Sequence, residues 1–144
     1  MALQIRPLRE RELHAMTRVW ELAGLPYRPT GRDSLESLQE QRKAFPDLFM
    51  GAFIDETLVG VAIASDDGRK GWINRLAVIP EARRHGIGTA IVEECERALR
   101  TRGRGVFSIL IEGENQVSED LFLKMGYKLE EYIKYYAKRD SQSV

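Results

Sequence analysis

One strand-like run, joined to a long amphipathic helix through a glycine-containing turn, constrains the fold of this 144-residue chain most. Residues 71–79 are mostly apolar and stop at Pro80. From Ile87 onward, apolar residues recur at helical spacing as far as Leu99. A helix that follows a strand and carries such a stripe packs back onto the sheet. The sequence therefore predicts an α/β protein.

The remaining patterns predict three further helices and at least five more strands. We expect helices over 9–23, from an Asp33/Glu36 capping box to about 45, and over 117–125. We expect strands over 3–6, 49–54, 58–65 and 106–111, with one or two more within 127–138. Residues 106–111 are nearly all apolar, which is typical of a strand at a sheet centre. This order predicts a three-layer sandwich of one domain, residues 1–139, followed by a polar tail, residues 140–144.

Charge and cysteine content exclude several classes of function. Lysine plus arginine equals aspartate plus glutamate at 22 each, so no overall positive field favours nucleic acid. A lone Cys95 and the absence of metal-site spacing predict neither a disulfide nor a bound metal. No apolar run approaches the thickness of a bilayer, so we expect no membrane association and a cytoplasmic location.

The turn Arg83-Arg84-His85-Gly86-Ile87-Gly88 has the composition of an anion site. Backbone amides at a helix start bind anions, and glycine lets a phosphate approach them. An ordinary strand-to-helix turn with solvated arginines is the alternative. A nucleotide-binding module is disfavoured, because the lysine of a P-loop and the third glycine of a dinucleotide fingerprint are both missing.

This turn resembles the central motif of the GCN5-related N-acetyltransferases (GNAT family), in which an Arg or Gln is followed, after two further residues, by Gly-x-Gly or Gly-x-Ala. The resemblance extends back through residues 76–81 and forward to Asn115 and residues 121–127. It implies a mixed, mostly antiparallel central sheet with splayed middle strands and about four helices. It also implies acetyl-CoA as cosubstrate and transfer of the acetyl group to a primary amine in a ternary complex.

The resemblance assigns cofactor contacts residue by residue. The pantetheine arm is expected on the strand before the turn, the pyrophosphate on the turn, and further contacts on the last predicted helix. The residues concerned are Leu76, Ala77, Val78, Arg83, Arg84, His85, Gly86, Ile87, Gly88, Thr89, Asn115 and Phe122. Asn115 is equally well explained as a helix cap.

The chain departs from the family pattern where the proton-transfer groups usually stand. Trp72 and Leu110 occupy the usual glutamate positions, and Phe122 occupies the usual tyrosine position. Glu112 lies two residues beyond Leu110, hence on the same strand face, and is our candidate base. A solvated glutamate at a strand end is the alternative for it. The missing groups also leave open a non-catalytic acyl-CoA-binding or regulatory domain.

The resemblance places a small-molecule or peptide amine acceptor opposite the cofactor. Tyr27, Arg28, Arg32, Asn74 and Arg75 are the candidate acceptor-binding residues. The arginines suit an acceptor with a carboxylate or phosphate. Alternatively, Arg28 and Arg32 lie in solvent and Arg75 pairs with Asp66 or Asp67. The tyrosine-rich C-terminal strand offers an edge for a homodimer.

Overall fold

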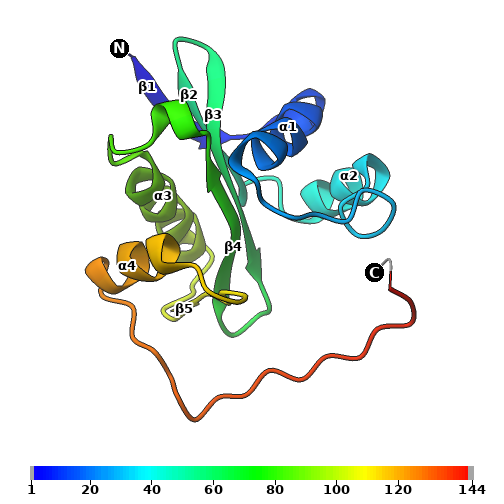
Figure 1. Cartoon of the computed structure of the whole chain (residues 1–144), viewed down its shortest axis with the longest axis vertical. Coiled ribbons are helices and arrows are strands. Elements are labelled where there is room, and N and C mark those ends of the chain that lie inside the picture. The colour runs from blue at the N-terminus through cyan, green and yellow to red at the C-terminus, as the bar shows by residue number, and fades with distance from the viewer. Residues whose placement is uncertain (1, 143–144) are drawn as a thin grey trace.

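A computed structural model of the chain describes residues 2–142, in which five strands form one sheet (Figure 1). The strands lie in the order β1-β2-β3-β4-β5, and all neighbours are antiparallel except β4 and β5, which are parallel. Their bounds are β1 Leu3–Pro7, β2 Phe49–Ile54, β3 Thr57–Asp66, β4 Gly71–Val78 and β5 Phe107–Ser108. The helices are α1 Leu13–Ala23, α2 Leu35–Ala44, α3 Ile87–Thr101 and α4 Gln116–Lys124, with short 3-10 turns η1 Glu10–Glu12 and η2 Pro80–Ala82. The predicted α/β class and mixed sheet are confirmed.

The helices cover the two faces of the sheet and make three layers. In Figure 1, α1 and α2 lie on one side of the strands, and α3 and α4 lie on the other. Two cores result, because alternate strand residues point to opposite faces. One core contains Trp20 of α1 with Phe49 and Val61. The other contains Ile91 of α3 and Phe122 of α4.

Strand β4 is irregular in its middle and separates from β5 beyond its first two residues. Its register against β3 shifts between the Val61–Ala77 and Ile63–Asn74 pairs, so β4 has one extra residue there. Arg75 in this bulge has φ 58°, a left-handed conformation that is uncommon outside glycine. Towards β5, only Gly71 and Trp72 are paired. This is the splay between middle strands that the resemblance implies.

Two strand predictions are wrong in extent. The predicted strand 106–111 is formed only at Phe107–Ser108, and the strands predicted within 127–138 are absent from the described residues. Residues 128–142 run instead as an extended segment away from the body (Figure 1). The predicted tail, residues 140–144, continues this segment to Gln142, and residues 143–144 lie outside the described part. Local β propensity did not decide the outcome, because a strand also needs a partner for its backbone.

The predicted cap of the second helix is displaced by one residue. The side chain of Ser34 caps α2 by accepting a hydrogen bond from the amide of Ser37 (3.1 Å). Asp33, which we had predicted as the cap, instead accepts from the amide of Arg28 (2.7 Å). The same Asp33 carboxylate oxygen lies 3.6 Å from Nη2 of Arg75 on β4.

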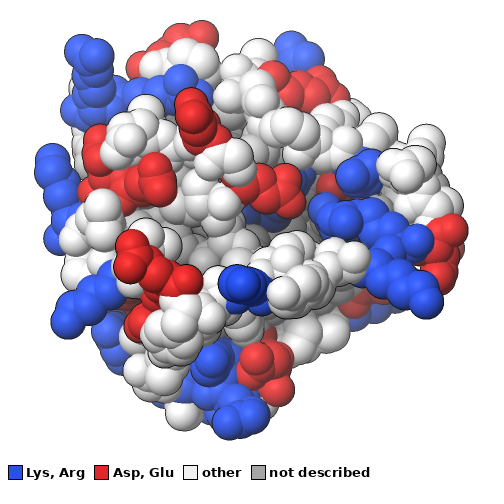
Figure 2. Space-filling model, turned by 60° about the horizontal axis from the view of Figure 1, so that its bottom comes forward, with Lys and Arg blue, Asp and Glu red and all other residues white. Residues whose placement is uncertain are grey.

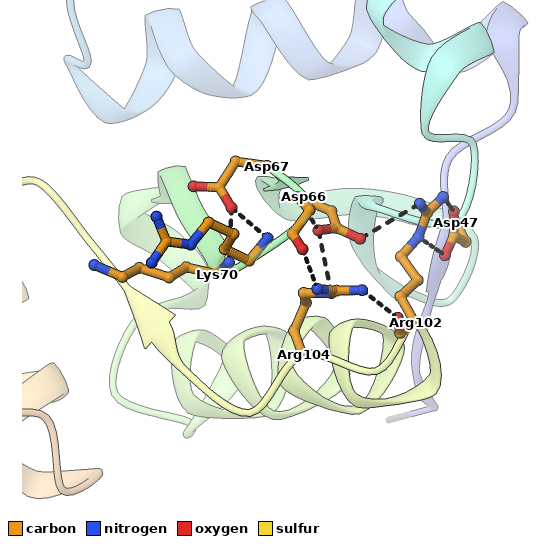
Figure 3. A network of polar contacts seen from close by, with 8 residues as sticks. Asp47, Asp66, Asp67, Lys70, Arg102 and Arg104 are labelled. Atoms are coloured by element: carbon orange, nitrogen blue, oxygen red, sulfur yellow. Dashed lines mark hydrogen bonds and ion pairs between the residues drawn. The ribbon is translucent and has the colours of Figure 1, made fainter.

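A polar network fixes the end of α3 to the last residue of β3 and to Asp47, two residues before β2 (Figure 3). Arg102 binds Asp47 through two hydrogen bonds of 2.9 and 2.6 Å. Asp66 receives Arg104 at 3.3 Å and Arg102 at 3.9 Å. A guanidinium and a carboxylate can pair through two parallel hydrogen bonds in one plane. These contacts therefore fix the position of the C-terminal end of α3.

Candidate active site

The turn between β4 and α3 presents several backbone amides that have no acceptor inside the helix. Gly86 is the N-cap of α3, and the first hydrogen bond within the helix joins the Ala90 amide to its carbonyl (3.0 Å). The amides of Ile87, Gly88 and Thr89 precede that bond, so the helix itself cannot satisfy them. Amides at the positive end of a helix dipole attract an anion. The geometry fits the phosphates that the sequence predicted here.

The two glycines of this turn serve different purposes. Gly86 has φ 72°, and a Cβ built on it would meet nothing within 4 Å. The space beside it is therefore open to a ligand, and glycine suits the backbone angle. A Cβ on Gly88 would lie 3.0 Å from Cδ1 of Leu121. Gly88 thus allows α3 and α4 to approach each other, a packing reason that differs from our expectation of phosphate access.

The three basic residues of the turn are not equivalent. Arg83 folds back, and its Nε donates to the carbonyl of Val78 (3.0 Å) while Nη2 donates to that of Ala23 (3.5 Å). This side chain ties the end of α1 to the end of β4. Arg84, with φ 68°, and His85 are exposed beside the open amides. They are the side chains placed to meet an anion there.

Along β4, the backbone from Ile73 to Val78 has no partner strand on the β5 side within the described residues. Leu76 and Val78 are half-buried, and Ala77 is buried. An unpaired edge offers amides and carbonyls to an extended ligand in the way a neighbouring strand would. This edge leads directly to the amides at the start of α3.

The predicted cofactor residues on α4 have structural roles in the chain itself. The Asn115 side chain caps α4 by accepting from the Ser118 amide (3.2 Å), so the capping alternative is confirmed. Phe122 is 5% exposed and packs edge-to-face on Tyr127 at 5.1 Å. Phe122 therefore lies in the core and offers little surface to a ligand.

On the opposite side of β4, Arg75 lies against α1 and the loop that follows it. Its guanidinium carbon lies 4.4 Å from the centre of the Trp20 ring, and its Nη2 lies 3.6 Å from the Asp33 carboxylate. Nε and Nη2 are buried without a hydrogen-bond acceptor among residues 2–142. Burial lowers the pKa of Arg75 below its ordinary value. The carboxylates of Asp33 and, less strongly, Glu112 offset this shift only in part.

The expectation that Arg75 pairs with Asp66 or Asp67 is wrong. Asp66 pairs with Arg102 and Arg104, and Asp67 accepts from the amide of Lys70 (2.7 Å; Figure 3). These contacts hold the pKa of Asp67 at about 2, through the Lys70 amide first. The bulge in β4 directs Arg75 towards α1 instead. Sequence reasoning missed Trp20 and Asp33 as partners of Arg75, and no local pattern signals them.

The other predicted acceptor residues differ in exposure and in their hydrogen-bond partners. The Tyr27 hydroxyl donates to Glu21 (2.5 Å), which raises the pKa of Tyr27. Arg28 donates to the carbonyl of Gln142, and Arg32 is exposed. Asn74 is half-buried on β4. The polar side-chain groups of Tyr27 and Arg28 are therefore already hydrogen-bonded within the chain.

The candidate base and the remaining titratable groups are also placed. Glu112 is exposed, and it lies near enough to Arg75 to affect the pKa of that guanidinium. His14 is exposed on α1. Cys95 is buried in α3, and burial raises its pKa to about 12, so this thiol stays protonated near neutral pH.

An anion site at the start of a crossover helix, beside a splayed strand with a free edge, is the site architecture of acyl-CoA-dependent N-acetyltransferases. The sequence profile of the Acetyltransferase (GNAT) family matches residues 14–127. The chain belongs to this family. It is an N-acetyltransferase with acetyl-CoA as its cosubstrate.

Relatives of known sequence agree with this assignment. An acetyltransferase of Sodalis glossinidius is 26% identical over 137 residues, which is 95% of each chain. One of Pectobacterium atrosepticum is 26% identical over 126 residues, or 88% of each. The alternative of a non-catalytic domain finds no support in these names.

Solved structures share the fold. The PaiA N-acetyltransferase of Thermoplasma acidophilum, in complex with coenzyme A, superposes with a TM-score of 0.77 at 26% identity. The match covers 90% of this chain and 92% of that one. The aminoglycoside N-acetyltransferase AAC(6')-Iy, with a bisubstrate analogue, gives a TM-score of 0.79 at 18% identity and covers 96% and 99%. No helix among the described residues is both long and apolar enough to cross a membrane.

Proposed function

We propose that acetyl-CoA lies along the free edge of β4 with its pyrophosphate at the start of α3. The unsatisfied amides of Ile87, Gly88 and Thr89 support this placement most directly. Arg84 and His85 are placed to add contacts to the outer phosphates, whereas Arg83 serves mainly to join α1 to β4. Acetyl-CoA supplies an activated thioester, and the β4 edge from Leu76 to Val78 orients it towards Arg75.

We propose that the acceptor amine enters beside Arg75, between the loop 27–33 and the end of β5. Structures with this fold include an aminoglycoside acetyltransferase with a bisubstrate analogue and the NatC complex bound to a Gag peptide. The fold therefore accommodates both small and peptide amines. The ion pair of Arg75 with Asp33 and the nearby Glu112 leave this side mixed in charge.

The lone reduced Cys95 supports a cytoplasmic location.

We propose Glu112 as the proton acceptor. An alkylammonium has a pKa of about 10.4, so the amine must lose a proton before it attacks. Glu112 is an exposed carboxylate at the end of the segment after β5, on the Arg75 side. Phe122, at the position of the usual tyrosine, has no polar atom, so we propose that solvent protonates the departing thiolate.

The acceptor class is tested by free-thiol release with acetyl-CoA over a panel of amino acids, polyamines, aminoglycosides and peptides. We expect one class to give turnover well above acetyl-CoA hydrolysis. For Glu112→Gln, we expect kcat with that acceptor to fall about tenfold or more, and the acidic limb of the pH–rate profile to disappear. Glu114→Gln is the matched control, because it neutralises an exposed carboxylate two residues further on. An unchanged profile in Glu112→Gln excludes the assignment.

The exposed apolar residues after Tyr127 also support a homodimer, which we propose as the working assembly.

A further inference from the structure

The stacked pair of Trp20 and Arg75, on the α1 side of β4, contains most of the unpartnered polar atoms of the described residues. Trp20 is 0% exposed, and its indole Nε1 has no acceptor. Nε and Nη2 of Arg75 are enclosed and have none either. Three of the four buried side-chain atoms without a partner among residues 2–142 therefore belong to this pair, and all three are N–H donors. Unpaired buried donors cost stability, so a cluster of them suits a ligand that brings oxygen atoms.

Arg102 shows how a guanidinium of this chain satisfies the same donors. Its Nε and Nη2 donate to the two oxygens of the Asp47 carboxylate at 2.9 and 2.6 Å. Arg75 has no such partner, because the Asp33 carboxylate lies 3.6 Å from its Nη2 and makes no hydrogen bond to it. Asp33 accepts instead from the amide of Arg28 (2.7 Å). Arg75 therefore keeps the capacity to bind a second carboxylate.

The guanidinium of Arg75 can be reached from one end. Its side chain is 24% exposed, and Nη1 is neither enclosed nor hydrogen-bonded within residues 2–142. Trp20 covers a face of the group at 4.4 Å, which leaves the nitrogens at its rim for hydrogen bonds. The backbone of Arg75 has φ 58°, a strained conformation of the kind that is concentrated at ligand sites. A carboxylate that binds Nη1 reaches Nη2 once the long contact to Asp33 gives way.

The charges around Arg75 favour a zwitterion over an ion of one sign. Burial lowers the pKa of Arg75 most, and then Asp33 raises it, Arg32 lowers it and Glu112 raises it, so these three groups lie within electrostatic reach. Two guanidinium groups are thus balanced by two carboxylates. A polyamine brings positive charge alone, and a phosphate group brings about two negative charges, whereas a free amino acid brings one charge of each sign. Side chains of both signs also surround the hollow in the face that Figure 2 shows.

We infer, on the basis of the acceptor side proposed above, that the acceptor is a free amino acid whose carboxylate binds the guanidinium of Arg75. The carboxylate takes Nη1 and Nη2 in place of the long contact to Asp33. The amine of the same molecule turns towards Glu112. Arg75 thus selects the acceptor and orients it, and takes no part in proton transfer.

Free-thiol release with acetyl-CoA tests this inference on three forms of each standard amino acid: the acid, its carboxamide, and the amine without the carboxyl group. We expect the wild type to prefer an acid over its amide by about thirtyfold or more in kcat/KM, because a charged donor left unpaired is costly. Arg75→Gln should abolish this preference and leave the KM for acetyl-CoA unchanged. Comparing the acid-to-amide ratio between the two proteins cancels the different amine pKa values of acid and amide. Arg97→Gln, at an exposed arginine on α3, is the matched control and should keep the wild-type ratio.

The outcomes separate this inference from the proposed transfer reaction. Thiol release with polyamines, aminoglycosides or peptides, and with no amino acid, overturns the inference and upholds the N-acetyltransferase reaction. An acid-to-amide ratio that is the same in Arg75→Gln as in the wild type also overturns it. No thiol release with any of these amines would contradict the proposed function itself.

A second variant tests the pairing in the opposite direction, in case Arg75→Gln does not fold by circular dichroism. Asp33→Asn keeps an oxygen for the Arg28 amide and removes the charge that competes for Arg75. The KM for the amino acid should fall severalfold, whereas a residue with a structural role alone would leave it unchanged or raise it. An unchanged or raised KM contradicts the inference.

Discussion

At the residue scale, a substitution at Gly86 can distinguish an effect on cofactor binding from an effect of backbone strain. Alanine there must adopt φ 72° and places a methyl group beside the open amides. We expect Gly86→Ala to lower stability by about 1 kcal/mol and to raise the KM for acetyl-CoA about tenfold or more. Steady-state kinetics and thermal melting measure both effects.

Gly103→Ala is the control for this substitution. Gly103 has φ 90°, its Cβ would also meet nothing within 4 Å, and it lies at the far end of α3. It should lose similar stability with an unchanged KM. Equal KM values in the two variants would remove Gly86 from the cofactor site.

Glu12 carries a predicted pH dependence of stability. Its hydrogen bonds from Arg6 hold its pKa at about 2, below the ordinary 4.5. The folded state therefore gains stability from the ionised carboxylate above about pH 4.5 and loses it as the pH falls towards 2. We expect Glu12→Gln to cost about 1–2 kcal/mol at pH 7 and much less at pH 2.5.

Urea unfolding at several pH values measures this difference. Glu10→Gln, at an exposed carboxylate of the same 3-10 turn, should be nearly neutral throughout. A constant gap between Glu12→Gln and the wild type from pH 7 to 2.5 would show that the pKa of Glu12 is not depressed.

At the element scale, the contact between α3 and α4 depends on Gly88. Valine at this position would press on Leu121, whose Cδ1 lies 3.0 Å from the Cβ position. We expect Gly88→Val to destabilise the fold by about 1–3 kcal/mol. Leu121→Ala in the same chain should recover part of that loss, so a double-mutant cycle on unfolding free energies measures the coupling. Strictly additive effects would show that the two side chains do not meet.

At the scale of the whole molecule, the proposed homodimer links stability to protein concentration. Dimerisation stabilises the folded state by mass action, so Tm should rise by several degrees between 1 and 100 µM protein. Calorimetry at both concentrations checks this result. Ile133→Lys with Tyr136→Lys places two charges among the exposed apolar residues after Tyr127, so this variant should have a Tm that does not depend on protein concentration. A concentration-independent Tm in the wild type would contradict the homodimer.

The sequence by itself determined what depends on neighbouring residues. The apolar stripe of α3, Pro80 at the end of the strand and the glycines of the turn predicted a crossover with an anion site at its start. The buried state of Cys95 and the exposure of His14 were also predictable, because helical periodicity states which face is buried.

The tertiary structure alone decided which distant groups meet. The Arg75 side chain points to Asp33 and Trp20 because of the bulge in β4. The Arg83 side chain donates hydrogen bonds to the carbonyls of Val78 and Ala23. Residues 106–111 and 127–138 have strand-like sequences, but a strand forms only where a partner accepts its hydrogen bonds. Strand propensity is encoded locally, whereas the presence of a partner strand depends on how the whole chain folds in space.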